Sequence, residues 1–283
     1  MQTIDVFGSR IAMTDQGAGV PVVMLHCSAA DSSQWDALRG ALGAGFRTVA
    51  PDQWACGGSD PWPGHQPFTL VMEARAVKDL IGASDEPVHL IGHSYGGAVA
   101  LRVARERPAA IRSLTVIEPS AFNLLRQDGP RSLPMFEEIA AVAETVRRTV
   151  LSEDLTGGMA YFVDYWNGQG AWAEMSERAR AMLVPRVGKV LLDFRALFLD
   201  DSLLEDLARL EVPTLILHGD RSPAPSRRIV ELLADTLPDV LVEPVAGAGH
   251  MSPVSHPETV NALIAGFIKY LVPASVRSRA RVA

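Results

Sequence analysis

Short apolar runs alternate with amphipathic stretches along most of the chain, which is typical of a sheet whose strands are joined by helices. Alternating positions near the N-terminus predict a half-exposed strand pair turned at Gly8-Ser9. Nearly continuous apolar runs predict strands covered on both faces at 20–26, 47–50, 88–91, 113–117, 212–218 and 240–243. Helices are predicted at 34–42, 69–81, 97–104, 225–236 and 257–271. We therefore predict an α/β protein with a mostly parallel, doubly wound sheet.

The alternation stops at Ala121 and resumes near residue 210. The segment between has helical periodicity without a convincing buried strand, with candidate helices at 134–151, 158–167, 171–185 and 188–199. We therefore predict three parts, which are an α/β core at 1–120 and 210–273, a helical domain at 121–209 and a flexible tail at 274–283.

The run Gly92-His93-Ser94-Tyr95-Gly96 joins a predicted buried strand to a predicted helix. A serine between two glycines at such a junction occupies a strained turn, so its hydroxyl projects above the edge of the sheet. Glycine is needed on both sides because a β-carbon would collide with the neighbouring strand or helix. The strand before Ser94 and the helix after it make this serine the candidate nucleophile.

Composition restricts the partners. The net charge of -7 argues against a nucleic-acid ligand, which requires a basic face. No apolar run approaches the length of a membrane span, and no signal peptide is recognisable. The two cysteines and the histidines have no metal-binding spacing. We expect a cytoplasmic protein that acts on a small molecule, without a metal, a nucleic acid or a membrane as partner.

Several motifs together resemble the α/β-hydrolase fold superfamily, specifically its lidded members. They occur in the superfamily's order over nearly the whole chain: Leu25-His26-Cys27-Ser28, Pro51-Asp52, Gly57-Gly58-Ser59-Asp60, the turn at Ser94, Leu217-His218-Gly219-Asp220 and Gly247-Ala248-Gly249-His250. The helical segment follows the sixth strand, where the superfamily places its lid. The resemblance implies a Ser-His-acid triad that requires no cofactor.

The triad needs a base, because a free serine hydroxyl is a poor nucleophile at neutral pH. His250 is the candidate base, since it follows a strand in a glycine-rich loop and precedes the last helix. Two residues are candidates for the acid. In the superfamily's usual site after the seventh strand, the expected position holds Ser222, and Asp220 comes two residues early. The superfamily's other site, the end of the sixth strand, holds Glu118. A buried carboxylate there needs a partner such as an imidazolium, so we favour Glu118 over Asp220.

The oxyanion is expected to receive the backbone N–H of Tyr95 and a second N–H from the loop after the third strand. Ser28 is favoured as that second donor, with Cys27 as the alternative, because Cys27 replaces the superfamily's glycine. Aromatic residues in or near loops on the catalytic side are predicted to line a substrate pocket: Trp35, Trp54 and Phe122. Four others at helical spacing are more typical of the interior of the lid than of a substrate wall: Tyr161, Phe162, Tyr165 and Trp166.

These residues predict a serine hydrolase of the carboxylesterase or lactonase type, acting on a small, partly hydrophobic molecule. A carbon–carbon bond hydrolase or a cofactor-free haloperoxidase would use the same triad. An alternative of another class is a non-catalytic ligand-binding protein of the hydrolase fold, which the absence of an acid at the usual position supports. Pairing of two copies through their lids, giving a homodimer, is compatible with either function.

Overall fold

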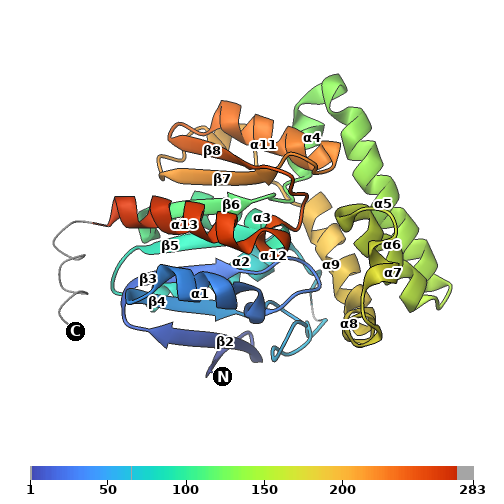
Figure 1. Ribbon diagram of the computed structural model, residues 1–283, viewed down its shortest axis with the longest axis horizontal. Coiled ribbons are helices and arrows are strands. Elements are labelled where there is room, and N and C mark those ends of the chain that lie inside the picture. The colour runs from blue at the N-terminus through green and yellow to red at the C-terminus, as the bar shows by residue number, and fades with distance from the viewer. Residues whose placement is uncertain (1, 65, 273–283) are drawn as a thin grey trace.

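The computed structural model describes residues 2–64 and 66–272, in which eight strands form one sheet (Figure 1). The strands are β1 (Gln2–Val6), β2 (Ser9–Gly17), β3 (Gly19–Leu25), β4 (Gly45–Pro51), β5 (Val88–His93), β6 (Ile111–Ile117), β7 (Thr214–Gly219) and β8 (Val240–Val245). Their order in the sheet is β1-β2-β4-β3-β5-β6-β7-β8, and only the pairings made by β2 are antiparallel. The predicted mostly parallel α/β sheet is therefore confirmed, whereas the predicted tail at 274–283 lies outside the described residues.

The sheet is covered on both faces because successive side chains of a strand point to opposite sides. On β3, Val23 and Leu25 belong to one apolar cluster, and Val22 and Met24 belong to another. Helices of the first face are α2 (Leu70–Gly82), α3 (Tyr95–Glu106) and α11 (Ala224–Thr236), and those of the second are α1 (Asp36–Leu42) and α13 (Pro257–Leu271). No helix within the described residues has the length and apolar character needed to cross a membrane.

A run of helices separates β6 from β7 and lies beside the carboxyl ends of the parallel strands (Figure 1). We call it the helical insertion; its members are α4 (Asn123–Gln127), α5 (Leu133–Leu151), α6 (Leu155–Asn167), α7 (Ala171–Glu174), α8 (Glu177–Leu183), α9 (Val187–Phe198) and α10 (Leu204–Leu207). The single helix predicted at 171–185 is wrong, because the backbone is extended at Met175 and Ser176. The Ser176 side chain accepts a hydrogen bond from the amide of Ala179 and so caps a new helix.

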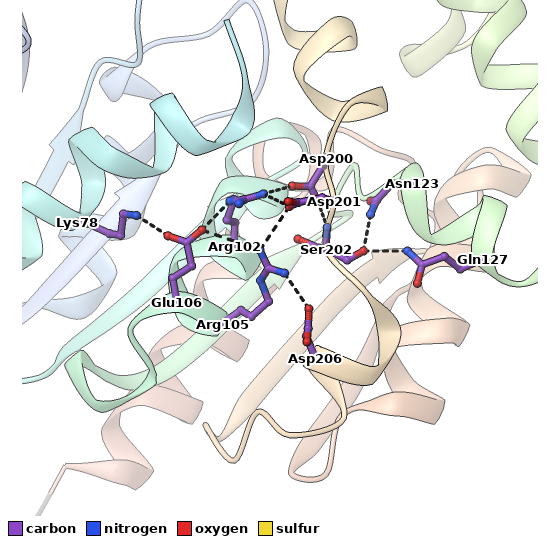
Figure 2. A network of polar contacts seen from close by, with 10 residues as sticks. All are labelled: Lys78, Arg102, Arg105, Glu106, Asn123, Gln127, Asp200, Asp201, Ser202 and Asp206. Atoms are coloured by element: carbon purple, nitrogen blue, oxygen red, sulfur yellow. Dashed lines mark hydrogen bonds and ion pairs between the residues drawn. The ribbon is translucent and has the colours of Figure 1, made fainter.

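An ion network holds the end of the insertion against α3 (Figure 2). Arg102 of α3 donates hydrogen bonds to Asp200 at 2.6 Å and to Asp201 at 2.7 Å. Arg105, one turn further along, donates to Asp206 of α10 at 2.8 Å. The Arg102 and Asp200 side chains are only 7% and 6% exposed, so losing either partner would leave a buried charge unpaired, whereas Asp201 is 76% exposed. The insertion therefore rejoins the core at a fixed position.

Buried histidines occupy the centre of the sheet. His89 of β5 is fully buried, and its Nδ1 lies 2.7 Å from Oγ of Ser113 on the neighbouring β6. Burial, and to a smaller extent the charge of Arg112, lowers the pKa of His89 to about 3. The folded protein therefore keeps this imidazole neutral at a pH where the unfolded chain protonates it.

We predict that acidification destabilises the fold partly through His89. Because its pKa is lower in the folded state, its contribution is complete above pH 6.5 and is lost progressively as the pH falls toward about 3. Between pH 7 and pH 5 this one group accounts for about 2 kcal/mol of the free energy of unfolding. Urea unfolding at both pH values should show a smaller acid-induced loss for His89→Phe than for the wild type, and equal losses would contradict the assignment.

Candidate active site

Ser94 lies on a sharp turn between β5 and α3, with φ 55° and ψ -115°. This left-handed backbone is strained for a residue with a β-carbon and is held by its surroundings. The Ser94 amide donates to the carbonyl of Ile117 on β6 at 2.9 Å. A β-carbon at Gly92 would collide with the backbone of Gly96, and one at Gly96 would collide with the carbonyls that end β3. Only glycine at both positions allows the strand and helix to approach this closely.

The structure brings Ser94, His250 and Glu118 together. Nε2 of His250 lies 2.8 Å from Oγ of Ser94, and its Nδ1 lies 3.3 Å from Oε2 of Glu118. His250 reaches the site from the loop between β8 and α12 (Ser252–Ser255), and Glu118 directly follows β6 with φ 47°. All three residues are buried. An ionised carboxylate only accepts hydrogen bonds, so Nδ1 carries the proton and Nε2 is free to accept one from Ser94.

Glu118 remains ionised in spite of complete burial. Burial opposes ionisation, but the hydrogen bond and charge of His250, together with hydrogen bonds from Ser222 and Gly219, keep the pKa of Glu118 below its usual value. Both the Ser222 hydroxyl and the Gly219 amide donate to Oε1 at 2.6 Å. The serine at the superfamily's usual acid position thus supports the carboxylate on the neighbouring strand.

Asp220, the other candidate for the acid, is placed elsewhere. Its Oδ1 accepts a hydrogen bond from the Gly247 amide at 2.9 Å, which ties the loop after β7 to the loop after β8. The carboxylate that bonds to His250 is that of Glu118. Asp220 comes too early in its loop to contact the imidazole. The alternative prediction, that Asp220 is the acid of the triad, is therefore wrong.

A second histidine connects the His250 loop to the loop after β3. The carbonyl of His250 accepts from Nε2 of His93 at 2.9 Å, and Nδ1 of His93 lies 3.1 Å from the Gln34 amide nitrogen. Burial lowers the pKa of His93 to about 3, with the His250 charge acting in the same direction, so the ring is neutral. Oε1 of Gln34 accepts from the Cys27 amide at 3.1 Å. Since the Cys27 amide already has this partner, Ser28 is the better second donor to an oxyanion.

The Tyr95 amide, the Cys27 thiol and the absence of a metal-binding cluster from the described part of the chain further define what this site can do. Tyr95 is the first residue of α3, so its amide has no partner within the helix and is available beside Ser94. Burial raises the pKa of the Cys27 thiol to about 12, which keeps it protonated and unsuited to nucleophilic attack. Within the described residues, no group of histidine, cysteine and acidic side chains is arranged to hold a metal ion.

A cavity of about 490 Å³ opens beside Ser94 and His250, between the loop after β3 and the helical insertion. Ser28 lines it on the core side, and Phe162 and Trp166 line it from α6. Phe162 and Trp166 were predicted to belong to the interior of the lid. The structure corrects this prediction, because both also line the cavity. The Trp166 ring lies against the His250 ring, with centroids 4.0 Å apart.

None of the three aromatic residues predicted to bind substrate lines this cavity. Trp35 packs in the apolar cluster on the α1 and α13 face, and Trp54 packs edge-on against Trp62. Both are fully buried, because their rings turn away from the site although their loops approach it. Phe122 does line a second, smaller cavity next to Ser94.

Sequence reasoning missed several residues around Ser94. The Ser120 hydroxyl lies 3.1 Å from Oγ of Ser94, and Met159 and Val163 of α6 line the larger cavity. It also missed Lys189 and Asp193, which are buried on α9. Their four-residue separation within an otherwise apolar helix was the available signal, since charged residues are rarely buried without a partner.

Comparison with known proteins supports the same identification of the fold. A model of the alpha/beta hydrolase family matches residues 22–263. A non-heme chloroperoxidase from Streptomyces lividans is 29% identical over 93% of this chain and 97% of its own. A 2-hydroxy-6-oxo-6-phenylhexa-2,4-dienoate hydrolase from Burkholderia cepacia is 25% identical over 92% of this chain and 91% of its own. The crystal structure of a hydrolase from Pseudomonas aeruginosa superimposes with a TM-score of 0.79 at 26% identity, covering 94% of this chain and 97% of that one.

We predict that Gly92→Ala destabilises the protein by about 3 kcal/mol or more, because the added carbon meets rigid backbone on α3. Gly249→Ala is the matched control, since a β-carbon there meets nothing within 4 Å. Thermal and urea unfolding of both variants would measure the difference. A stable Gly92→Ala protein would contradict the close approach of β5 and α3.

Proposed function

The chain belongs to the alpha/beta hydrolase family, and we propose that it is a serine hydrolase that cleaves an ester, lactone or related acyl bond. The observation that carries this proposal is the hydrogen-bonded series from Glu118 through His250 to Ser94. It ends at a cavity of about 490 Å³ whose walls include Met159, Phe162 and other apolar side chains. This volume fits a small, partly hydrophobic substrate.

Attack by Ser94 on the substrate carbonyl requires removal of its proton. Nε2 of His250 lies 2.8 Å from Oγ and is unprotonated when Nδ1 donates to Glu118, so it serves as the general base. Glu118 then stabilises the imidazolium, since its lowered pKa keeps it negatively charged. Ser120, 3.1 Å from Oγ of Ser94, donates to the serine oxygen while Ser94 donates to His250.

The tetrahedral intermediate is stabilised by backbone donors. The Tyr95 amide lies at the N-terminus of α3, whose dipole favours negative charge, and the Ser28 amide is the second donor. His250 passes the proton to the leaving alcohol, and the acyl group remains on Ser94. Water then attacks the acyl-enzyme with His250 again acting as base, which releases the acid and restores the serine.

We also propose that the helical insertion acts as a lid over this site. Its α6 supplies the Trp166 ring that lies against His250, and α8 supplies Leu183 to the cavity wall. Arg186, in the turn before α9, donates to Asp31 at 2.9 Å and to the carbonyl of Ala29 at 2.8 Å. These contacts support a lid that rests on the loop after β3.

A second candidate function is that of a cofactor-free haloperoxidase, which the printed name of the Streptomyces lividans relative favours. The same serine and histidine can pass an acyl group to hydrogen peroxide in place of water. A carbon–carbon bond hydrolase is a third, favoured by the name of the Burkholderia cepacia relative. Neither requires a different triad, so the choice among the three depends on the substrate.

We predict that Ser94→Ala abolishes both ester turnover and labelling by a fluorophosphonate probe, since Oγ is the atom that forms the covalent bond. Hydrolysis of activated esters and lactones, with mass spectrometry of the adduct, would measure both. Folded wild-type protein that shows neither turnover nor an adduct on Ser94 would contradict the proposal and favour a non-catalytic binding protein.

We predict that Glu118→Gln lowers kcat by about 10³-fold or more, because an amide does not hold the histidine in the required tautomer. Asp220→Asn, the matched control, should change kcat by less than about threefold, since an asparagine still accepts the hydrogen bond from Gly247. Steady-state kinetics on a hydrolysed ester would compare them. A collapse of the rate in Asp220→Asn alone would reverse the assignment of the acid.

A further inference from the structure

A cluster of three buried charges joins α9 of the helical insertion to the core beside Ser94. Lys189 of α9 forms ion pairs with Asp193 on its own helix and with Glu73 of α2, the latter at 3.3 Å. The side chains of Lys189, Asp193 and Glu73 are each 2% exposed. The ammonium group also lies over the ring of Tyr95, 4.4 Å from its centroid.

Within the described part of the chain, each side-chain oxygen and nitrogen of this cluster has a hydrogen-bond partner except Oδ2 of Asp193. Oε1 of Glu73 accepts from the Trp54 amide at 3.1 Å, and Oε2 accepts from the Tyr95 hydroxyl at 3.1 Å as well as from Lys189. Oδ1 of Asp193 accepts from Lys189. Among residues 2–64 and 66–272, no hydrogen bond reaches Oδ2 of Asp193. The Ser28 hydroxyl, which lines the same cavity, is near enough to favour the ionised form of Asp193 but makes no regular hydrogen bond to Oδ2. A buried charged oxygen satisfied this poorly is costly, so a further donor from outside the chain is favoured.

Asp193 and the reacting serine line the same small cavity. This second cavity, of about 10 Å³, is also lined by Ser28 and Ser120. The remaining walls are apolar side chains of the core and the insertion: Phe122, Phe162, Trp166, Val190, Phe194 and Leu197. The two cavities share Ser28, Ser94, Phe162 and Trp166 among their lining residues, so they are adjacent at the reacting serine. The smaller one has room for about one water-sized group.

The charge of the cluster indicates what this group is. Two carboxylates face one ammonium, which leaves a surplus negative charge in a site shielded from water. Burial accordingly raises the pKa of Asp193 to about 6, although Lys189 and Ser28 act in the opposite direction. At neutral pH the carboxylate is ionised, and a hydrogen-bond donor, above all a cationic one, offsets its charge.

We propose that Asp193 is a specificity-determining residue that binds a compact hydrogen-bond donor, an ammonium or hydroxyl group, on the carbon next to the substrate's scissile carbonyl. The inference rests on the proposed acyl chemistry at Ser94 and adds the substrate class. A group on the acyl side needs one heavy atom beyond the carbon next to the carbonyl, which the small cavity accommodates. A donor group on the alcohol side of the ester would be separated from the carbonyl by more atoms. The bulky remainder of the acyl group then occupies the cavity of about 490 Å³.

Three methyl esters test this proposal, because they differ only at the position in question: methyl phenylglycinate with an amino group, methyl mandelate with a hydroxyl and methyl phenylacetate with hydrogen. Their affinities are measured by calorimetry on Ser94→Ala, so that binding is observed without turnover. The amino and hydroxy esters should bind about tenfold or more tightly than methyl phenylacetate. If the surplus negative charge sets the affinity, the amino ester should bind most tightly. If hydrogen bonding alone sets it, the hydroxy ester should bind as tightly as the amino ester.

Variants at Asp193 assign the preference to this carboxylate. Asp193→Leu on the Ser94→Ala background leaves the Lys189–Glu73 pair balanced in charge and should reduce the preference to about twofold or less. Asp193→Asn keeps the volume and removes the charge, so the amino ester should lose its advantage even if the leucine variant folds poorly. Asp200→Leu is the matched control: its carboxylate is 6% exposed and bonded to Arg102 in a separate network (Figure 2), and the preference should persist.

Each outcome decides one proposal. Equal affinity for the three esters, no detectable binding of any of them, or a preference that survives in both Asp193 variants overturns the role of Asp193. A preference that depends on Asp193, in a protein whose Ser94 form hydrolyses none of the three esters, supports the binding site and overturns the hydrolase function on this class of substrate. Turnover without a preference supports hydrolysis and overturns the inference.

Discussion

The close approach of β5, α3 and the end of β3 is the constraint on which the candidate site depends. Glycine at 92 and 96 permits it, and Ser94 is thereby forced into a left-handed backbone with φ 55°. Glu118, at the end of the adjacent strand, is also left-handed with φ 47°. Each such residue costs on the order of 1–3 kcal/mol, which the surrounding fold must offset. Backbone hydrogen bonds to the next strand do so, from Ser94 to Ile117 at 2.9 Å and from Glu118 to Leu217 at 3.0 Å.

With Glu118 as the acid, the candidate triad comes from the ends of three strands, β5, β6 and β8, with β7 lying between the last two. β5 leads to Ser94, β6 leads to Glu118, and the loop after β8 brings His250 over both. The loop after β7 contributes donors instead of an acid, through the Gly219 amide and the Ser222 hydroxyl. These donors allow a carboxylate to remain charged in the interior, since each stabilises the ionised form.

Much of the fold followed from the sequence because strands covered on both faces and amphipathic helices leave strong local patterns, and the turn at Ser94 has its own glycine spacing. Side-chain direction did not follow. Trp35 and Trp54 lie on loops near the site, but packing turns their rings into the core. Tertiary pairing did not follow either. Glu73 and Lys189 are 116 residues apart, and a lysine in a helical sequence is ordinarily solvent-exposed. Such a pair is recognisable only once the elements are assembled.

The Lys189 contact with Glu73 also limits how freely this chain can recombine with its relatives. Helical segments between β6 and β7 look like exchangeable modules, because most of their helices lie together beside the carboxyl ends of the strands (Figure 1). In this protein, a chimaera that replaced the segment would keep Ser94, Glu118 and His250 but lose Lys189. Glu73 would then face the Tyr95 hydroxyl as a buried charge without a cation, directly behind the turn that carries Ser94. Glu73 of α2 and the helical insertion therefore depend on one another. A stable chimaera has to change position 73 together with the inserted helices.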